Sequence, residues 1–262
     1  MWKKVAFLFP ALVLTALALG VCDPAGKEPA PVSLPVVTDG SQVVPCANAE
    51  GWTVEIEALR AAVRDIELTV EGETHASLLC RVSELAIPSA SAHPGHYAGG
   101  EVTGELAGDF VVDFVSGDGA VLGEASLLPG DYNGMNLYFR AATTADGLEA
   151  GDPLVGHAAV ISGTAKKDAI EIAFDAVLDI EEGAQMVGGP FDLNVDEGTS
   201  ATLGLALYTI DPSENDTLFD GLDFGALDGD GDGAVAIAPG DEAHNVLMKT
   251  FVRHDHWGVI VH

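Results

Sequence analysis

The chain has 262 residues, with 11 Lys and Arg against 41 Asp and Glu, which gives a formal net charge of −30. This excess of negative charge argues against nucleic acid and anionic membrane surfaces as partners, and it favours cations. Because 48% of the residues are hydrophobic, the chain has enough apolar side chains for a packed core, which argues against disorder throughout.

Residues 1–21 have the pattern of an export signal. A basic start over residues 1–4 precedes an apolar run that ends in small residues. A retained transmembrane anchor is the alternative, since the run lies at the short limit for a membrane span. The pattern predicts export to an oxidising compartment.

Cys22 follows the signal at once. The segment Leu19-Gly20-Val21-Cys22 resembles a bacterial lipobox, in which a signal peptidase cleaves before a cysteine that becomes lipid-modified. The segment departs from that pattern at Val21, where a small residue is usual. Ordinary cleavage after Gly20 is the alternative. The resemblance implies an envelope lipoprotein that touches a membrane only through the lipid on Cys22.

Proline dominates the segment that follows the signal. Five prolines and few large apolar residues predict an extended, flexible tether over residues 22–50. Residues 51–262 are predicted to form a single β-rich domain. The prolines are Pro24, Pro29, Pro31, Pro35 and Pro45.

The three cysteines leave one without a partner in an exported protein. If Cys22 carries lipid, Cys46 and Cys80 remain to form a disulfide, which would close a loop of about 35 residues and contribute roughly 3–4 kcal/mol in the chain-entropy model. The alternative is two unpaired buried thiols.

The body alternates apolar and polar residues with a period of two, and Gly- and Asp-rich turns separate the alternating segments. Many short strands without alternating helices predict a mainly β fold, an antiparallel β-sandwich or a barrel-like domain. The predicted strands are 53–59, 66–71, 78–87, 110–115, 135–140, 158–163, 170–175, 177–180, 191–195 and 203–210.

Two helices are predicted near the C-terminus, within residues 211–253. Asp211-Pro212-Ser213-Glu214 is typical of a helix start, with an N-cap, a first-position proline and a capping-box Glu. A second helix is predicted from Asp241-Glu242 to near Arg253, because Ala243, Leu247 and Phe251 recur every four residues.

The residues between these helices resemble the first half of an EF-hand calcium loop. Asp228, Asp230 and Asp232 occupy loop positions 1, 3 and 5, and Gly233 stands at position 6. Pro239 stands where the loop needs its bidentate Glu. We therefore predict a Ca²⁺ site that is completed by the carbonyl of Ala234 and by Glu242 from the next helix. An ion-free Asp- and Gly-rich surface turn is the alternative.

Histidines cluster in two short segments, 93–96 and 254–256. Pro94-Gly95 forces a turn that lets the flanking rings point into one space, and a His-x-His pair in an extended chain places both rings on one face. Imidazole nitrogens suit zinc or copper(II). Surface or half-buried histidines without a metal are the alternative. The predicted ligands are His93, His96, His157, His254 and His256.

The segment Ala92-His93-Pro94-Gly95-His96-Tyr97, together with the anchor and the β-rich body, resembles uncharacterised bacterial envelope lipoproteins. A looser similarity connects the body to periplasmic copper-binding β proteins that accompany metallophore systems, and it implies metal capture or handover. Their four-cysteine pattern is absent, since the body has only Cys46 and Cys80. No metal ligand is therefore transferred from them.

These patterns predict a non-catalytic envelope lipoprotein that binds zinc or copper. Its expected partners are metal ions and an envelope metal transporter or receptor, in the periplasm or outside the cell. The first alternative is a calcium-stabilised structural or adhesive surface module with incidental histidines. The second is a metal-dependent hydrolase with Glu101 or Asp255 as general base. The sequence contains no HExxH or Gly-x-Ser-x-Gly motif to support that hydrolase.

Overall fold

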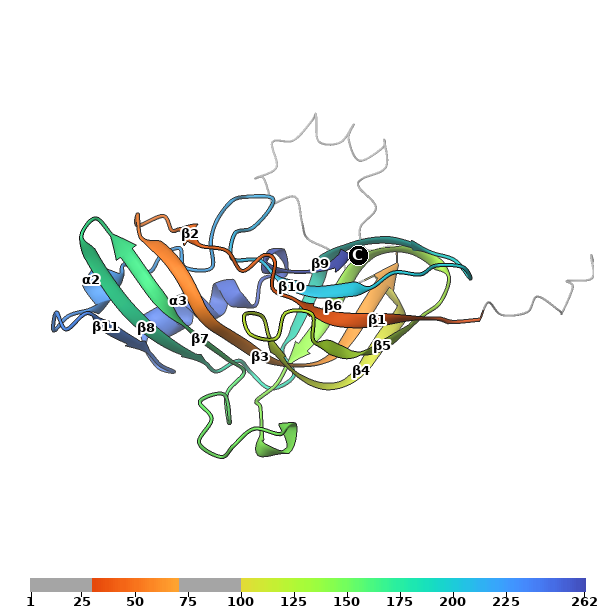
Figure 1. Cartoon of the computed structure of the whole chain (residues 1–262), viewed down its shortest axis with the longest axis horizontal. Helices are drawn as coiled ribbons and strands as arrows, with labels where there is room; N and C mark the ends of the chain where they lie inside the picture. Colours follow the sequence, from red (N-terminus) through yellow and green to blue (C-terminus); the bar gives the residue numbers. More distant parts are fainter. Residues whose placement is uncertain (1–29, 71–99) are drawn as a thin grey trace, which may run out of the picture.

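The computed structural model describes residues 30–70 and 100–262, and β-strands dominate them (Figure 1). The helices are η1 (Thr144–Asp146), α2 (Phe224–Leu227), α3 (Glu242–Phe251) and η2 (His254–His256). The strands are β1 (Val32–Asp39), β2 (Cys46–Ala47), β3 (Thr53–Val70), β4 (Glu101–Asp113), β5 (Val121–Leu127), β6 (Gly130–Phe139), β7 (Ala159–Lys167), β8 (Ile170–Leu178), β9 (Gln185–Val195), β10 (Leu203–Leu207), β11 (Ala234–Ile237) and β12 (Trp257–Val261).

One sheet contains all of these strands. Its main path runs β11-β8-β7-β3-β4-β5-β1-β10-β12, while β2 and β6 pair with β3, and β9 pairs with β6. The pairs β1–β10 and β11–β8 are parallel and the others antiparallel, so the sheet is mixed. Although β12 contacts β9, no ladder of hydrogen bonds joins them. The mainly β prediction is confirmed, whereas the described strands do not close into a barrel and a two-sheet sandwich is not confirmed.

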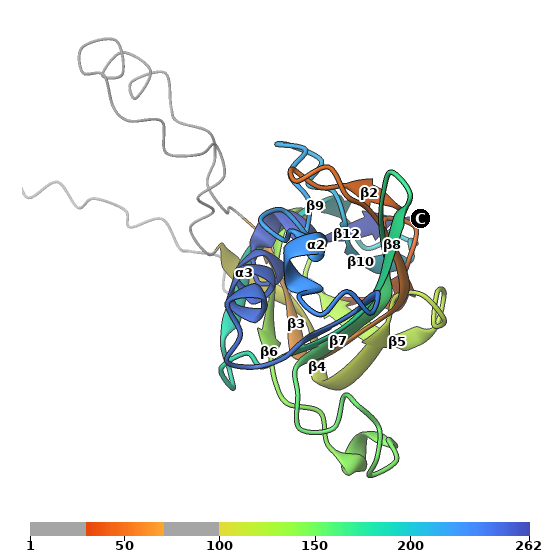
Figure 2. The same ribbon diagram turned by 90° about the vertical axis from the view of Figure 1, so that its left-hand side faces the viewer.

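The long strand β3 connects the two ends of the sheet. On one edge it pairs with β7 as far as Ala61 and then with β6 from Val63, and β4 covers its opposite edge from Arg60 onward. The register shifts at Asp65, which has a positive φ of 47° and accepts a hydrogen bond from the Gly108 N–H at 3.0 Å. A β-bulge of this kind bends the strand, and Figure 2 shows the sheet curving around its interior.

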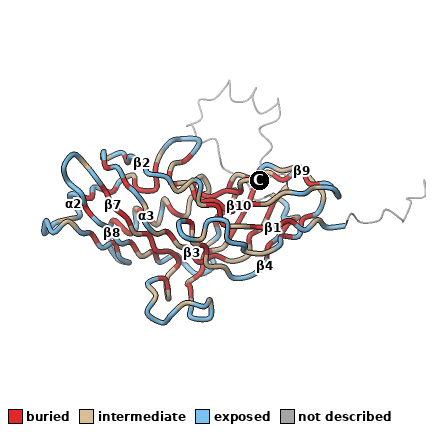
Figure 3. Tube along the Cα trace, in the orientation of Figure 1, coloured by how far each residue is buried: buried red, intermediate tan, exposed pale blue. Residues whose placement is uncertain are grey.

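Two aromatic clusters belong to the buried core, and Figure 3 shows that buried residues run along the strands. One cluster joins Phe114, Phe139, Phe251 and Trp257, with ring centroids 5.4 to 6.0 Å apart. The other joins four rings from β8, α2 and the loops beside them: Trp52, Phe174, Phe219 and Phe224. Burial of such rings dominates the energetics of a core.

The predicted tether is too long at its C-terminal end. Residues 32–39 form β1, which lies between β5 and β10, and residues 46–47 form β2. Leu34 and Val36 are buried on one face of β1 with exposures of 1% and 3%. Because proline is compatible with extended backbone, Pro35 suits this strand as well as a tether. The folded body therefore begins before residue 51.

The two predicted helices have different outcomes. The second is confirmed as α3, in which Ala243, Leu247 and Phe251 are buried. The first is wrong, because the chain turns back on itself after Asp211, with an isolated antiparallel bridge between Ile210 and Thr217. No helix in the described part of the chain is long and apolar enough to cross a membrane.

Candidate cation sites

The loop that begins at Asp228 gathers three carboxylates. Oxygens of Asp228, Asp230 and Asp232 all lie within 4.8 Å of one another. The Asp228 carboxylate accepts hydrogen bonds from the N–H groups of Asp232 at 3.1 Å and Gly233 at 3.2 Å, which holds the loop closed. Gly233 has a φ of 81°, a left-handed conformation that glycine adopts without steric cost. The loop therefore brings together the three Asp residues that the sequence predicted to lie close to one another.

The chain beyond this loop does not bring Glu242 to it. Ala234 begins β11, which pairs with β8, and the Ala173 N–H donates to the Gly233 carbonyl at 2.9 Å. After β11 the chain makes a further turn, and Glu242 becomes the first residue of α3. Glu242 does not belong to the group of oxygens within 4.8 Å, so its predicted place in the site is wrong.

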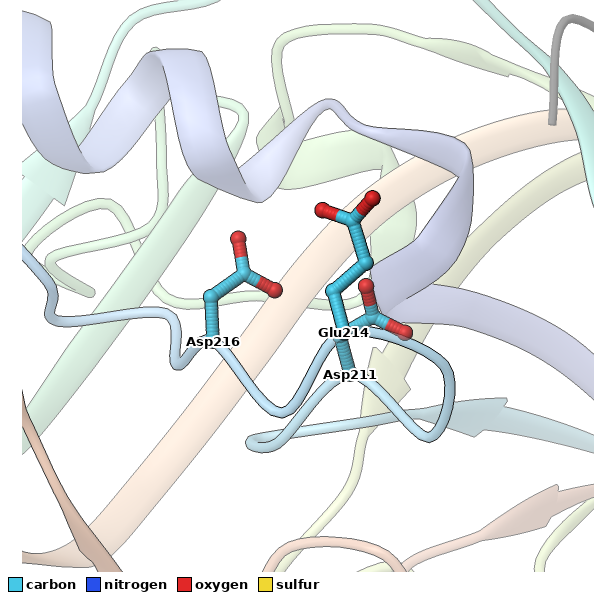
Figure 4. Close-up of side chains that lie close together, drawn as sticks. All are labelled: Asp211, Glu214 and Asp216. Atoms are coloured by element: carbon cyan, nitrogen blue, oxygen red, sulfur yellow. The ribbon is translucent and has the colours of Figure 1, made fainter. Parts of the chain in front are cut away.

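A second acidic group lies in the loop that was predicted to start a helix. Oxygens of Asp211, Glu214 and Asp216 lie within 4.8 Å of one another, and Figure 4 shows the three carboxylates gathered on one side of the loop. The Asp211 N–H donates to the Asp216 carbonyl at 2.8 Å, and Asn215 has a φ of 62°. Pro212 and Glu214, typical of a helix start, here belong to a closed turn.

Burial perturbs the carboxyl group of Asp211. Its side chain is 0% exposed, and its Oδ1 accepts a hydrogen bond from the Ser213 N–H at 2.6 Å. Desolvation raises the pKa of Asp211, and the nearby charges of Asp255 and Asp216 raise this pKa further. Negatively charged side chains thus lie close together at a partly buried position, and their mutual repulsion opposes ionisation of Asp211.

The structure does not unite the predicted histidine ligands. His93 and His96 lie outside the described residues. His157 contacts Asp179 through Nδ1 at 2.7 Å, while the buried His256 contacts the Tyr208 carbonyl through Nδ1 at 2.8 Å. Within residues 30–70 and 100–262, the groups of three or more metal-binding side chains contain only carboxylates. His157, His254 and His256 therefore do not form a three-ligand site among the described residues.

The export signal, Cys22 and Cys80 lie outside the described residues, and Cys46 lies within them. Cys46 is a buried thiol on β2, and burial raises its pKa to about 11. Its predicted disulfide partner, Cys80, is not among the described residues, so the pairing stays a prediction.

Sequence reasoning overlooked the group of Asp211, Glu214 and Asp216. The sequence does contain three acidic residues within six positions. Asp211 and Glu214, however, were interpreted as the N-cap and capping-box residues of a helix, so their grouping with Asp216 was not predicted. Comparison of the chain with protein-family models, curated proteins and solved structures finds no match. The candidate sites therefore have to be interpreted from their own chemistry.

Proposed function

We propose that this chain is a non-catalytic, β-rich module of the cell envelope that is stabilised by calcium in the loop 228–234. The observation that carries the proposal is the convergence of Asp228, Asp230 and Asp232 within 4.8 Å. Their spacing and the left-handed Gly233 match the corresponding positions of an EF-hand loop. Export and lipid attachment at Cys22 are part of the proposal, and the residue pattern of the N-terminus supports them.

The chemistry of this loop favours calcium over other cations. Ca²⁺ takes six to eight oxygen ligands in a flexible geometry, whereas Mg²⁺ requires a nearly ideal octahedron. Three carboxylates supply part of that shell, and the Ala234 carbonyl and water supply the rest. Because Glu242 does not take part, we expect weak binding with a Kd of about 10⁻⁴ to 10⁻³ M, the range of extracellular calcium modules.

Calcium in this loop would stabilise one end of the sheet. The loop connects α2 to β11, and β11 is the terminal strand beside β8. A ligand that binds only the folded chain raises its stability by RT ln(1 + [L]/Kd). At ten times Kd this amounts to about 1.4 kcal/mol, or roughly 3–6 °C in Tm for a domain of this size.

Thermal unfolding of the purified protein tests the proposal. We expect Tm to be higher in millimolar CaCl₂ than in chelator, and the increment to be smaller in Asp230→Asn. Asp230 is exposed, so this substitution leaves the core intact. Asp192→Asn, another exposed carboxylate on β9, is the matched control. Equal Tm values with calcium and with chelator in the parent protein would contradict the proposal.

Transition-metal capture, with handover to an envelope transporter or receptor, stays a prediction. It depends on His93 and His96, which lie outside the described residues, and the described histidines form no group of three metal ligands among themselves. The geometry therefore supports the calcium-stabilised module better.

A further inference from the structure

A concentration of negative charge surrounds Arg253. Its guanidinium lies 2.6 Å from Asp216 Oδ2, 2.5 Å from Asp255 Oδ2 and 3.7 Å from Glu214 Oε2. Asp211 belongs to the same group, because its carboxylate lies within 4.8 Å of those of Glu214 and Asp216. The charges of Asp255 and Asp216 raise the pKa of Asp211. One guanidinium thus faces three carboxylates directly, and Asp211 adds a fourth. The single positive charge of Arg253 cannot neutralise these four acidic groups when they are ionised.

Several carboxylate oxygens in this group are buried without a hydrogen-bond partner among the described residues. Asp211, which is 0% exposed, uses Oδ1 to accept the Ser213 N–H, while its Oδ2 has no partner. Asp216 Oδ1 and Asp255 Oδ1 are also buried and lack a partner. Leaving a buried acceptor unsatisfied is energetically unfavourable, and more so when the acceptor is charged, so these oxygens favour a bound cation.

We propose that Asp211, Glu214 and Asp216 bind a second divalent cation, Ca²⁺, at the loop 211–216. Their oxygens lie within 4.8 Å of one another, close enough to share one ion. The wholly buried Asp211 offers an oxygen with no competing partner, and the exposed Glu214 leaves a route for water and ion. The group contains no imidazole or thiolate, and an all-oxygen site of irregular shape favours Ca²⁺ over Zn²⁺ and Mg²⁺.

This ion would act at a different place from the ion in the loop 228–234. Arg253, which contacts Asp216, is the N-cap of η2, and η2 leads directly into β12. A cation bound by the loop 211–216 would therefore fix the approach to the last strand, at the end of the sheet path opposite β11.

Calcium titration of the purified protein by isothermal calorimetry tests the second site. We expect two Ca²⁺ per chain in the parent, one in Asp230→Asn, one in Asp211→Asn and none in the double variant. Asp211→Asn keeps the shape of the side chain and its acceptor for the Ser213 N–H. Asp192→Asn is the control and should retain both ions.

The two proposals fail in different ways. If Asp230→Asn binds no calcium while the parent binds one ion, the second site does not exist. If Asp211→Asn binds none and Asp230→Asn retains one ion, the loop 228–234 is not a calcium site. Should Asp211→Asn fail to fold, Glu214→Gln in the Asp230→Asn background decides, because Glu214 is exposed. At least tenfold weaker binding supports the second site, and unchanged binding overturns it.

Discussion

Removal of the Asp146 carboxylate would leave a buried positive charge without its counter-ion. Arg140, the residue directly after β6, is 3% exposed, and its Nη1 and Nη2 donate to the two Asp146 oxygens at 2.9 and 2.8 Å. The guanidinium also donates to the carbonyls of Val63 and Phe110, both at 3.1 Å. These bonds hold Arg140 in place, so it cannot move to water when its partner is lost.

The expected cost of Asp146→Ala is therefore large. Breaking a buried ion pair by removing one partner costs about 3–5 kcal/mol. For a domain of this size the loss corresponds to a fall in Tm of roughly 6–20 °C. Asp109→Ala is the matched control, because Asp109 Oδ1 lies 3.5 Å from Arg140 Nε but its side chain is 59% exposed. An exposed pair contributes about 1 kcal/mol or less.

Urea unfolding followed by tryptophan fluorescence at pH 7 measures both variants. Arg140 lowers the pKa of Asp146, so the contribution of this pair is present above the unfolded pKa of about 3.9. It disappears as pH falls through the lowered folded pKa, and the variant and the parent should then converge in stability. A loss in Asp146→Ala at pH 7 no larger than that in Asp109→Ala would refute the reasoning.

Two further predictions concern packing and ionisation. Gly163→Ala places a new Cβ 2.1 Å from the Glu55 carbonyl oxygen, so we expect about 1–3 kcal/mol of lost stability in urea, against about 0.5 kcal/mol or less for Gly151→Ala, which has open space. Equal unfolding midpoints would contradict this. In the reduced protein at pH 8, the buried Cys46 thiol, with its pKa raised to about 11, should resist alkylation until urea unfolds the chain. Its contribution to stability should be lost as pH rises from about 9 to about 11. Because the chain has two other cysteines, alkylation is read at the peptide that contains Cys46, and its rapid modification in native protein would show that this thiol is accessible.

Local patterns predicted local structure well. Alternation located most strands, but it divided β3 at Asp65, where a bulge interrupts the period without ending the strand. Spacing of apolar residues located α3, and the spacing of Asp228, Asp230 and Asp232 predicted their convergence.

Long-range partners were beyond such patterns. No local sequence pattern indicates that Val36 pairs with Leu203 in a parallel ladder. The prolines of this region led to the prediction of a flexible tether where the structure has β1. The chemistry of Asp211 and Glu214 suits a helix cap and an acidic loop equally well. The fold around Asp211 decided between the two.

The place of β1 in the sheet affects how the module would carry mechanical load. If Cys22 carries the proposed lipid anchor, tension on the chain would reach the sheet at Val32, where β1 begins. Because β1 is hydrogen-bonded to β5 on one edge and to β10 on the other, tension along this strand would load two ladders in shear at the same time. Many hydrogen bonds would then have to break together. An edge strand peeled from its end would instead release them one after another. If the chain is tethered as proposed, the central position of β1 would therefore make the sheet resist mechanical unfolding from that end.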